Sequence, residues 1–160
     1  VITPDFRGRG FSAWDPDWTN YRPRTYVDDV RRLLDELAID RAALVGTSLG
    51  GLVATAFTTE WPERVAGVVL NDIGPEIGEQ GLARIKGYIG RATPVSSWDD
   101  AVRQAREIYE LAWPGLNDAD WHRLVRRSYR ENDAGIPQLD MDPRIGDAAR
   151  EVGTGLNDPW

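Results

Sequence analysis

The sequence predicts an α/β protein in which parallel strands are joined by helices and followed by a largely helical region. Two short apolar runs, 42–48 and 64–75, lack the polar alternation of a half-exposed strand, which is typical of strands covered on both faces. Segments with helical spacing precede and separate these runs. The alternation of strands and helices favours a parallel sheet with right-handed crossovers.

The N-terminal part predicts a strand end, a loop and a helix. Val1 and Ile2 are expected to end a buried strand that leads into the glycine-containing loop 5–12. Thr25 and Asp28 have the spacing of a capping box, so a helix is expected to begin there. Its apolar positions recur at helical spacing and are Tyr26, Val27, Val30, Leu33, Leu34 and Leu37.

The middle of the chain predicts a strand, a helix and a second strand. The apolar run 42–48 leads into an expected helix from Leu49 to about Trp61, which Pro62 ends. The second apolar run, 64–75, is closed by a turn. Beyond it the pattern changes, and no further run of this kind follows.

The later part of the chain predicts helices. Ser97 and Asp100 have capping-box spacing, and Asp118 is expected to begin a further helix. The apolar positions of the two helices are Trp98, Ala101, Val102, Ala105, Ile108, Tyr109 and Ala112, and then Trp121, Leu124, Val125 and Tyr129. A short extended piece is expected at 137–141.

Composition and charge exclude several classes of partner. The 160 residues are 41% hydrophobic and 28% charged, which is typical of a soluble globular protein. The net charge of -7 argues against nucleic acid, since binding a polyanion needs a basic surface. The densest basic run, 125–130, is interpreted as a solvated helix face. No apolar run has the length of a membrane span, so no membrane partner is expected.

The sequence implies no metal and no organic cofactor. Cysteine is absent, which excludes disulfides, thiolate zinc sites and a cysteine nucleophile. Two acidic pairs, Asp15 with Asp17 and Asp140 with Asp142, lack the further ligands and glycine spacing of a calcium loop. They are interpreted as turn residues. Cysteine usage leaves the compartment open, and a cytoplasmic location is the expectation.

Ser48 stands at the point where the first apolar run is expected to turn into a helix. Gly46 and Gly50 flank it in the pattern G-x-S-x-G, in which a tight turn projects a nucleophile and side chains two positions away would clash. A serine N-cap in a glycine-rich turn and a phosphate-holding loop are the alternatives. No lysine follows as in a P-loop, and no third glycine is placed for a dinucleotide site. The sequence therefore favours a nucleophile elbow.

These motifs resemble the α/β-hydrolase superfamily, in particular its cap-bearing bacterial members. The resemblance rests on "PDFRGRGFS" (4–12), "LVGTSLGG" (44–51) and "PERVAGVVLNDIGP" (62–75), with the helical stretch beyond them. They resemble, respectively, the loop after the family's fourth strand, its nucleophile elbow and its sixth strand. The fold that this implies is a partial α/β-hydrolase fold. Residues 1–77 would form the central core with the fourth to sixth strands, 78–150 a helical cap, and 151–160 the start of the return to the core.

The resemblance implies a serine hydrolase. Ser48 would be the nucleophile, and the N–H of Leu49 would form one half of the oxyanion hole. Gly50, Gly51 and Ala54 would be small so that the helix packs closely on the sheet. The elbow carries no aspartate, unlike the dehalogenases and epoxide hydrolases of this fold, which points to acyl chemistry. The expected substrate is a small carboxylic ester, lactone or related acyl compound.

The base and the acid of such a site are not evident. A serine attacks a carbonyl only when a base, usually histidine, removes its proton. The single histidine, His122, follows Trp121 in an expected cap helix and is interpreted as a surface or half-packed residue rather than a base. Asp72 follows the sixth strand, where some families of this fold carry their acid. It is also explained as a residue that closes a turn or binds backbone amides.

The chain is expected to be an excerpt that depends on segments before and after it. The resemblance would place a strand between those at residues 1 and 42, so a gap would run through the sheet and leave backbone groups unpaired. The isolated 160 residues are therefore not expected to behave as a cooperative domain.

The alternatives to a serine hydrolase are a non-catalytic binding module or pseudoenzyme on the same fold and, within the fold, a C–C bond hydrolase or an acyltransferase.

Three tryptophans of the expected cap have two interpretations. Trp98, Trp113 and Trp121 are candidates for contact with an apolar or aromatic acyl group. Packing of the cap onto the core is the favoured interpretation.

Overall fold

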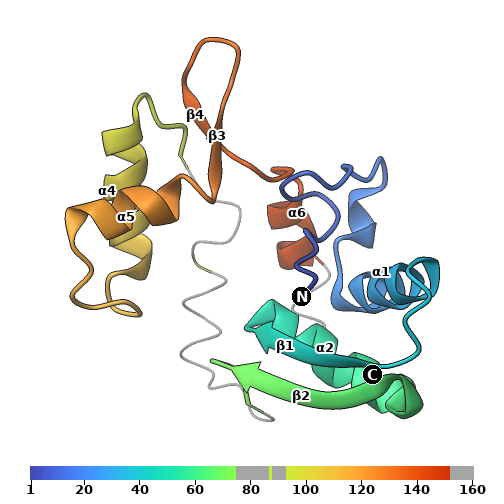
Figure 1. The fold of residues 1–160 in the computed structure, drawn as a ribbon. Helices are drawn as coiled ribbons and strands as arrows, with labels where there is room; N and C mark the ends of the chain where they lie inside the picture. The colour runs from blue at the N-terminus through green and yellow to red at the C-terminus, as the bar shows by residue number, and fades with distance from the viewer. Residues whose placement is uncertain (75–86, 88–92, 152–160) are drawn as a thin grey trace.

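The computed structural model describes residues 1–74, 87 and 93–151 (Figure 1). Its elements, in chain order, are η1 (Trp18–Asn20), α1 (Pro23–Glu36), β1 (Ala42–Thr47), α2 (Leu49–Glu60), η2 (Pro62–Arg64), β2 (Val65–Asn71), α4 (Trp98–Tyr109), α5 (Asp118–Val125), β3 (Tyr129–Glu131), β4 (Pro137–Leu139) and α6 (Ile145–Glu151). The rest of the expected cap and return segment, at 75–86, 88–92 and 152–160, lies outside the described residues. Within the described part, no helix is long and apolar enough to cross a membrane.

β1 and β2 form a parallel pair joined by the crossover helix α2, as the sequence predicts. The register aligns Val45 with Val69 and Thr47 with Asn71. Parallel strands require such a crossover because the carboxyl end of the first strand and the amino end of the second lie at opposite edges of the sheet. The carboxyl ends of both strands, and hence Ser48, therefore lie at the same edge (Figure 1).

The prediction that both strands are covered on both faces is wrong for the described residues. Val45 and Val69 have 75% and 57% of their surface exposed. They lie side by side in the register, on the face opposite α2. The structure explains the exposure, because α2 packs on one face of the pair and the described residues place no element over the other.

The expected strand at Val1 and Ile2 is also not formed. Both residues are exposed and neither pairs with a strand of the described part. The strand was expected from apolar side chains alone, but a strand needs a neighbour for its backbone hydrogen bonds. The following loop, 5–12, is ordered by its own contacts and by those to residues 140–142.

α1 begins at Pro23, so the predicted capping box at Thr25 is wrong. Arg22 is the N-cap and makes no side-chain cap bond. Proline suits the first helical turn because its missing N–H would have no intrahelical partner there. Thr25 therefore lies within the helix, where its backbone N–H bonds to the carbonyl of Arg22 at 3.1 Å.

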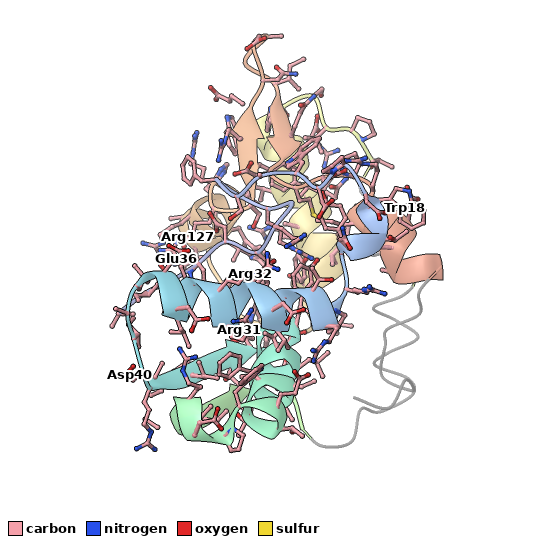
Figure 2. The ribbon with its side chains drawn as sticks, turned by 90° about the vertical axis from the view of Figure 1, so that its right-hand side faces the viewer. Trp18, Arg31, Arg32, Glu36, Asp40 and Arg127 are labelled. Atoms are coloured by element: carbon pink, nitrogen blue, oxygen red, sulfur yellow. The ribbon has the colours of Figure 1, made fainter. Side chains whose placement is uncertain are left out.

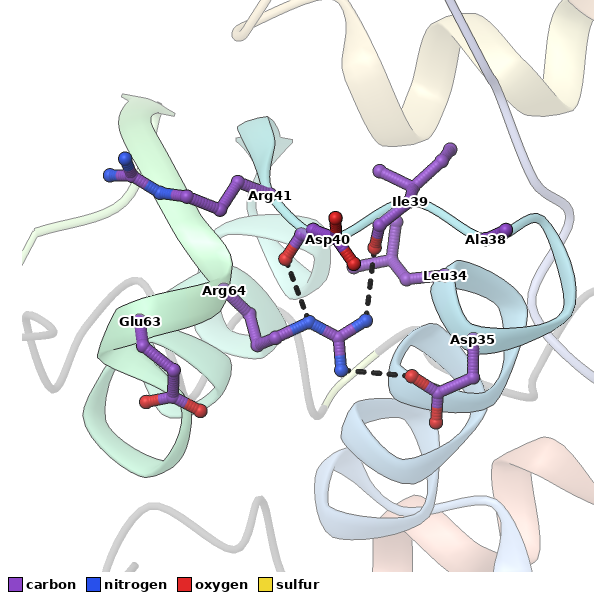
Figure 3. A pocket seen from close by; sticks show the side chains of 8 residues that line it. All are labelled: Leu34, Asp35, Ala38, Ile39, Asp40, Arg41, Glu63 and Arg64. Atoms are coloured by element: carbon purple, nitrogen blue, oxygen red, sulfur yellow. Dashed lines mark hydrogen bonds and ion pairs between the residues drawn. The ribbon is translucent and has the colours of Figure 1, made fainter.

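The carboxyl end of α1 is closed by a Schellman-type motif. Ala38 has φ 51°, in the left-handed region, and the N–H of Ile39 bonds to the carbonyl of Leu34 at 2.9 Å. The Arg64 guanidinium, at the end of η2, contacts the segment that follows this helix end. It donates to the carbonyls of Ile39 and Asp40 (Figure 3).

The main apolar core lies between α1 and α2, and α6 contributes to it. Figure 2 shows α1 lying between the β1–α2 layer and the loops above it. The Arg31 guanidinium of α1 lies 5.7 Å from the ring centroid of Trp61.

The chain returns to this core earlier than expected. Ile145 of α6 is already buried in it, whereas the return was expected at residue 151. The buried members are Tyr21, Tyr26, Val27, Leu34, Val53, Ala56, Phe57, Ile145 and Ala148.

α4 and α5 form a second cluster with its own buried residues, Ala101, Val102, Ala105, Trp121 and Val125. The predicted cap of α4 is confirmed, because the Ser97 side chain accepts a hydrogen bond from the Asp100 N–H. α5 ends at Val125, however, so the prediction that this helix reaches Tyr129 is wrong. Tyr129 instead pairs with Leu139 in the antiparallel hairpin of β3 and β4, whose second strand matches the extended piece expected at 137–141.

Candidate active site

Ser48 occupies a strained turn between β1 and α2. Its backbone has φ 49° and ψ −115°, a conformation that residues other than glycine rarely adopt. β1 ends one residue before it and α2 begins one residue after it. Such strain costs about 1–3 kcal/mol and persists only where the surrounding structure enforces it. This geometry is the one the sequence predicts for a nucleophile elbow.

The two flanking glycines have different roles. A Cβ at Gly46 would lie 2.3 Å from the carbonyl oxygen of Gly50, so only glycine fits where β1 meets α2. A Cβ at Gly50 would meet nothing within 4 Å, so the predicted steric need for glycine at that position is wrong for the described part. Gly51 fits the predicted packing role, since a Cβ there would lie 2.2 Å from Cγ2 of Ile73.

Hydrogen bonds hold the turn from both sides. The Ser48 N–H donates to the carbonyl of Asn71 at 3.2 Å, and its own carbonyl accepts from the N–H groups of Gly51 and Leu52. Across the same strand ends, the Asn71 side-chain amide donates to Thr47 Oγ1 at 3.3 Å. The sequence pattern did not predict a role for Asn71 at this turn. The parallel register shows that role, because it places Asn71 beside Thr47.

The N–H of Leu49, the expected oxyanion donor, lies at the first position of α2. Leu49 is the first residue of α2, and within the described residues its N–H has no backbone partner. The first N–H groups of a helix have no intrahelical acceptor and carry the positive end of the helix dipole. A negative charge developing next to Ser48 would therefore be stabilised here.

Asp72 lies at the same edge of the sheet, directly after β2. Its side chain is exposed and its backbone has φ 52°. Asp and Asn adopt this left-handed conformation more readily than most residues. The backbone geometry therefore fits the turn-closing interpretation of Asp72, while its place beside the Ser48 turn leaves the acid role a prediction.

His122 belongs to the α4–α5 cluster. Its Nε2 lies 3.8 Å from an Asp99 carboxylate oxygen, and 43% of its side chain is exposed. Figure 1 shows α4 and α5 packed together, apart from β1 and α2. In the described residues, no hydrogen bond connects His122 to Ser48.

The three tryptophans differ in exposure. Trp121 is 1% exposed and packs between α4 and α5, which favours the packing interpretation. Trp98 is partly covered by the Arg126 guanidinium, 4.2 Å from its ring, and its indole N–H donates to Glu131. Trp113 is 42% exposed, and its ring is tilted against that of Tyr109, with the centroids 5.1 Å apart.

Ser48 does not line either of two surface hollows formed by the described residues. One, of about 510 Å³, lies around Arg64 and is lined by charged side chains, among them Asp35 and Glu63 (Figure 3). It adjoins Arg41, at the start of β1, so the strand's length puts it about 20 Å from Ser48. The other, of about 500 Å³, lies between the loop 4–16 and α1.

The acidic pairs are held by the protein's own groups. Asp17 caps η1 by accepting from the Thr19 N–H, as expected of a turn residue. Arg7 pairs with Asp15 and with Asp29, and in consequence its pKa is raised. Burial raises the pKa of Asp15, but the Asp17 amide and Arg7 outweigh it and hold that pKa low. Asp142 is fully buried, which a turn interpretation does not anticipate.

Residues 1–120 match the family of the alpha/beta hydrolase fold. The structure is similar to that of an alpha/beta hydrolase from Novosphingobium aromaticivorans, with a TM-score of 0.83 and 36% identity, over 89% of this chain and 50% of the other. The sequence is 28% identical over 157 residues to 2-(acetamidomethylene)succinate hydrolase of Mesorhizobium japonicum, covering 98% of this chain and 54% of the relative. It is 28% identical over 136 residues to 3-hydroxybutyrate-oligomer hydrolase of Cupriavidus necator, covering 85% and 43%. The chain thus spans about half the length of these curated relatives.

Proposed function

Because the chain belongs to the alpha/beta hydrolase fold family, we propose that it is the nucleophile-bearing part of a serine hydrolase. Its substrate class is a carboxylic ester, lactone or related acyl compound. The relatives named above hydrolyse, by their names, an acetamido compound and oligomers of a hydroxy acid, and both are acyl compounds. The observation that carries the proposal is the strained backbone of Ser48 at the strand-to-helix turn.

The proposed reaction proceeds through an acyl-enzyme. The Ser48 Oγ attacks the carbonyl carbon as a base takes its proton, and the N–H of Leu49 donates to the resulting oxyanion. Collapse of this intermediate breaks the bond to the leaving group, which takes up the proton. Water then attacks the acyl carbon, releases the acid and restores the serine.

The base is proposed to come from outside these 160 residues. His122 lies in the α4–α5 cluster and is engaged with Asp99. The curated relatives are about twice as long as the part matched here, which leaves room for a further histidine and acid. Asp72 remains a candidate acid by its position after β2.

The experiment compares Ser48→Ala with Ser128→Ala in the complete protein. Ser128 is a matched control, because it is exposed and, within the described part of the chain, its hydroxyl donates only to the carbonyl of Leu124. Hydrolysis of a small aryl ester, and covalent labelling by a fluorophosphonate, are expected to disappear with Ser48→Ala alone. Hydrolysis at the parent rate after Ser48→Ala would overturn the assignment.

Two other functions use the same turn. If the complete protein binds a small acyl compound without turnover and resists the fluorophosphonate, it is a binding module or pseudoenzyme. If the fluorophosphonate labels Ser48 but esters are poor substrates, analysis of products separates C–C bond hydrolysis from acyl transfer.

A further inference from the structure

The loop 5–12 and the segment 140–142 are joined by backbone hydrogen bonds although more than a hundred residues separate them. The N–H of Gly10 donates to the carbonyl of Asp140 at 3.0 Å, and the N–H of Asp142 donates to the carbonyl of Gly8 at 2.7 Å. Arg9 and Met141 form an antiparallel bridge between these two bonds. The segment that follows β4 is thus paired with the loop that precedes η1.

A buried carboxylate lies where this pairing ends. Asp142 is 0% exposed and accepts a hydrogen bond of 2.6 Å from the Tyr21 hydroxyl. The Arg144 guanidinium donates to the same carboxylate at 2.6 Å and also to the backbone carbonyl of Asp15 at 2.9 Å. A charge removed from water is tolerated only when it is paired and hydrogen-bonded in this way.

The Tyr21 ring lies directly against the loop. A Cβ at Gly8 would lie 2.6 Å from the ring, and Gly8 has φ 77°, so glycine is required there for two reasons. The same hydroxyl that donates to Asp142 also accepts from the Asp15 N–H at 2.8 Å. Tyr21 therefore connects Gly8, within the loop, and Asp15, just beyond it, to the buried carboxylate.

The hairpin of β3 and β4 continues this connection to the helical pair. The Tyr129 hydroxyl donates to the Gln104 side chain of α4 at 2.7 Å, and the Trp98 indole donates to Glu131 at 2.8 Å. On the other side, the Arg130 guanidinium lies 4.5 Å from the ring centroid of Phe11 in the loop. β3 thus contacts α4 through Tyr129 and Glu131, and the loop 5–12 through Arg130.

We propose that Asp142, Tyr21 and Arg144 form a clasp that fixes the orientation of the α4–α5 pair on the core. The clasp fixes the segment 140–144 on the core. The hairpin, which precedes this segment, is hydrogen-bonded to α4 and so fixes the position of that helix. This role does not depend on Ser48 being a nucleophile. The clasp thus adds a polar connection to the apolar contacts that Met141 and Ile145 make with the core.

The first test uses Asp142→Asn with Asp140→Asn as its matched control, in the complete protein. Both substitutions remove one carboxylate charge from the same segment, but Asp140 only pairs with the half-exposed Arg130. Breaking a buried pair is expected to lower hydrogen-exchange protection of β3 and β4 about a hundredfold, without a comparable effect of the control. Equal protection in the two variants would overturn the clasp.

The second test measures orientation directly. The 160 residues contain no cysteine, so spin labels can be introduced at Arg32→Cys on α1 and Glu107→Cys on α4, both exposed. With Asp142→Asn the distance distribution is expected to become roughly twice as broad, while Asp140→Asn keeps the parent width. If Asp142→Asn does not fold, Tyr21→Phe carries the same test, because it removes one hydrogen bond and keeps the ring. A parent-like distribution in the variant that folds would refute the proposal.

Discussion

The N–H of Ser48 donates a hydrogen bond of 3.2 Å to the carbonyl of Asn71, which ties the turn after β1 to the end of β2. The strained residue is therefore held between the sheet on one side and the first turn of α2 on the other. Neither strand nor helix needs an unusual sequence for this arrangement. It depends instead on the absence of a side chain at Gly46.

Gly46→Ala and Gly50→Ala make a matched pair that tests this dependence. Alanine at 46 would place Cβ 2.3 Å from a backbone carbonyl oxygen that cannot move without displacing α2. We expect a loss of about 1–3 kcal/mol in the free energy of unfolding and loss of fluorophosphonate labelling. Gly50→Ala should stay within about 0.5 kcal/mol of the parent. Urea denaturation of the complete protein measures both.

A larger loss in the free energy of unfolding for Gly50→Ala than for Gly46→Ala would contradict the role assigned to Gly46. A large loss with Gly50→Ala alone would mean that a segment outside the described residues lies against its Cα. The experiment therefore also reports on what covers this side of α2 in the complete protein.

The order β1, α2 and β2 could be predicted from sequence because apolar runs and helical spacing are local signals. The Ser48 turn is predictable for the same reason: its strain follows from a short pattern between a strand and a helix. The capping of α1 is not, since both Thr25 and Pro23 are acceptable helix starts and only the folded chain decides. Asp142 is beyond local reasoning, because its partner Tyr21 lies 121 residues away in sequence.

The exposed valines of the sheet illustrate a further limit of sequence reasoning. Val45 and Val69 have the composition of buried strand residues, and the prediction of burial assumed elements on both faces. Composition indicates that a face is to be covered but does not say by which segment. The described residues supply α2 on one face only.

Ala38→Gly is expected to stabilise the protein. Ala38 has φ 51° at the end of α1, where an L-residue with a side chain costs roughly 1 kcal/mol relative to glycine. The residue is exposed, so the substitution removes little packing. An increase in the urea midpoint is expected, with Ala43→Gly, at the second position of β1, as the contrasting variant that loses stability. A decrease with Ala38→Gly would mean that the Schellman geometry is not populated in solution.

Trp121→Ala and Trp113→Ala compare the truncation of a buried and of an exposed tryptophan in the helical pair. Trp121 is 1% exposed within the α4–α5 cluster, so its truncation should cost about 3–5 kcal/mol. Trp113 is 42% exposed, and its truncation should cost less than about 1 kcal/mol. If Trp113 contacts the substrate, its variant will raise KM at unchanged stability. A similar fall in melting temperature for both variants would contradict the assignment of Trp121 to the core of the α4–α5 cluster.

Stability is expected to fall in acid because of Asp142. Burial raises the pKa of this carboxyl, but the hydrogen bonds from Arg144 and Tyr21 outweigh burial and hold it below its usual value. In the unfolded chain the group takes up a proton near pH 4. Its contribution is therefore complete above about pH 4 and is lost as the pH falls through the lower pKa of the folded state. The folded protein binds fewer protons in that interval, so the free energy of unfolding decreases with decreasing pH.

Urea denaturation at a series of pH values from 7 to 3 measures this loss in the complete protein. Asp142→Asn should be less stable than the parent at pH 7 and should lose less of its stability on acidification, because the substituted amide does not titrate. Tyr21→Phe removes one of the bonds that lower the pKa, so the pKa of the folded state moves closer to that of the unfolded chain. The loss on acidification should therefore be smaller than in the parent and should end at a higher pH. Parallel pH profiles for the parent and Asp142→Asn would show that this carboxylate is not the group responsible.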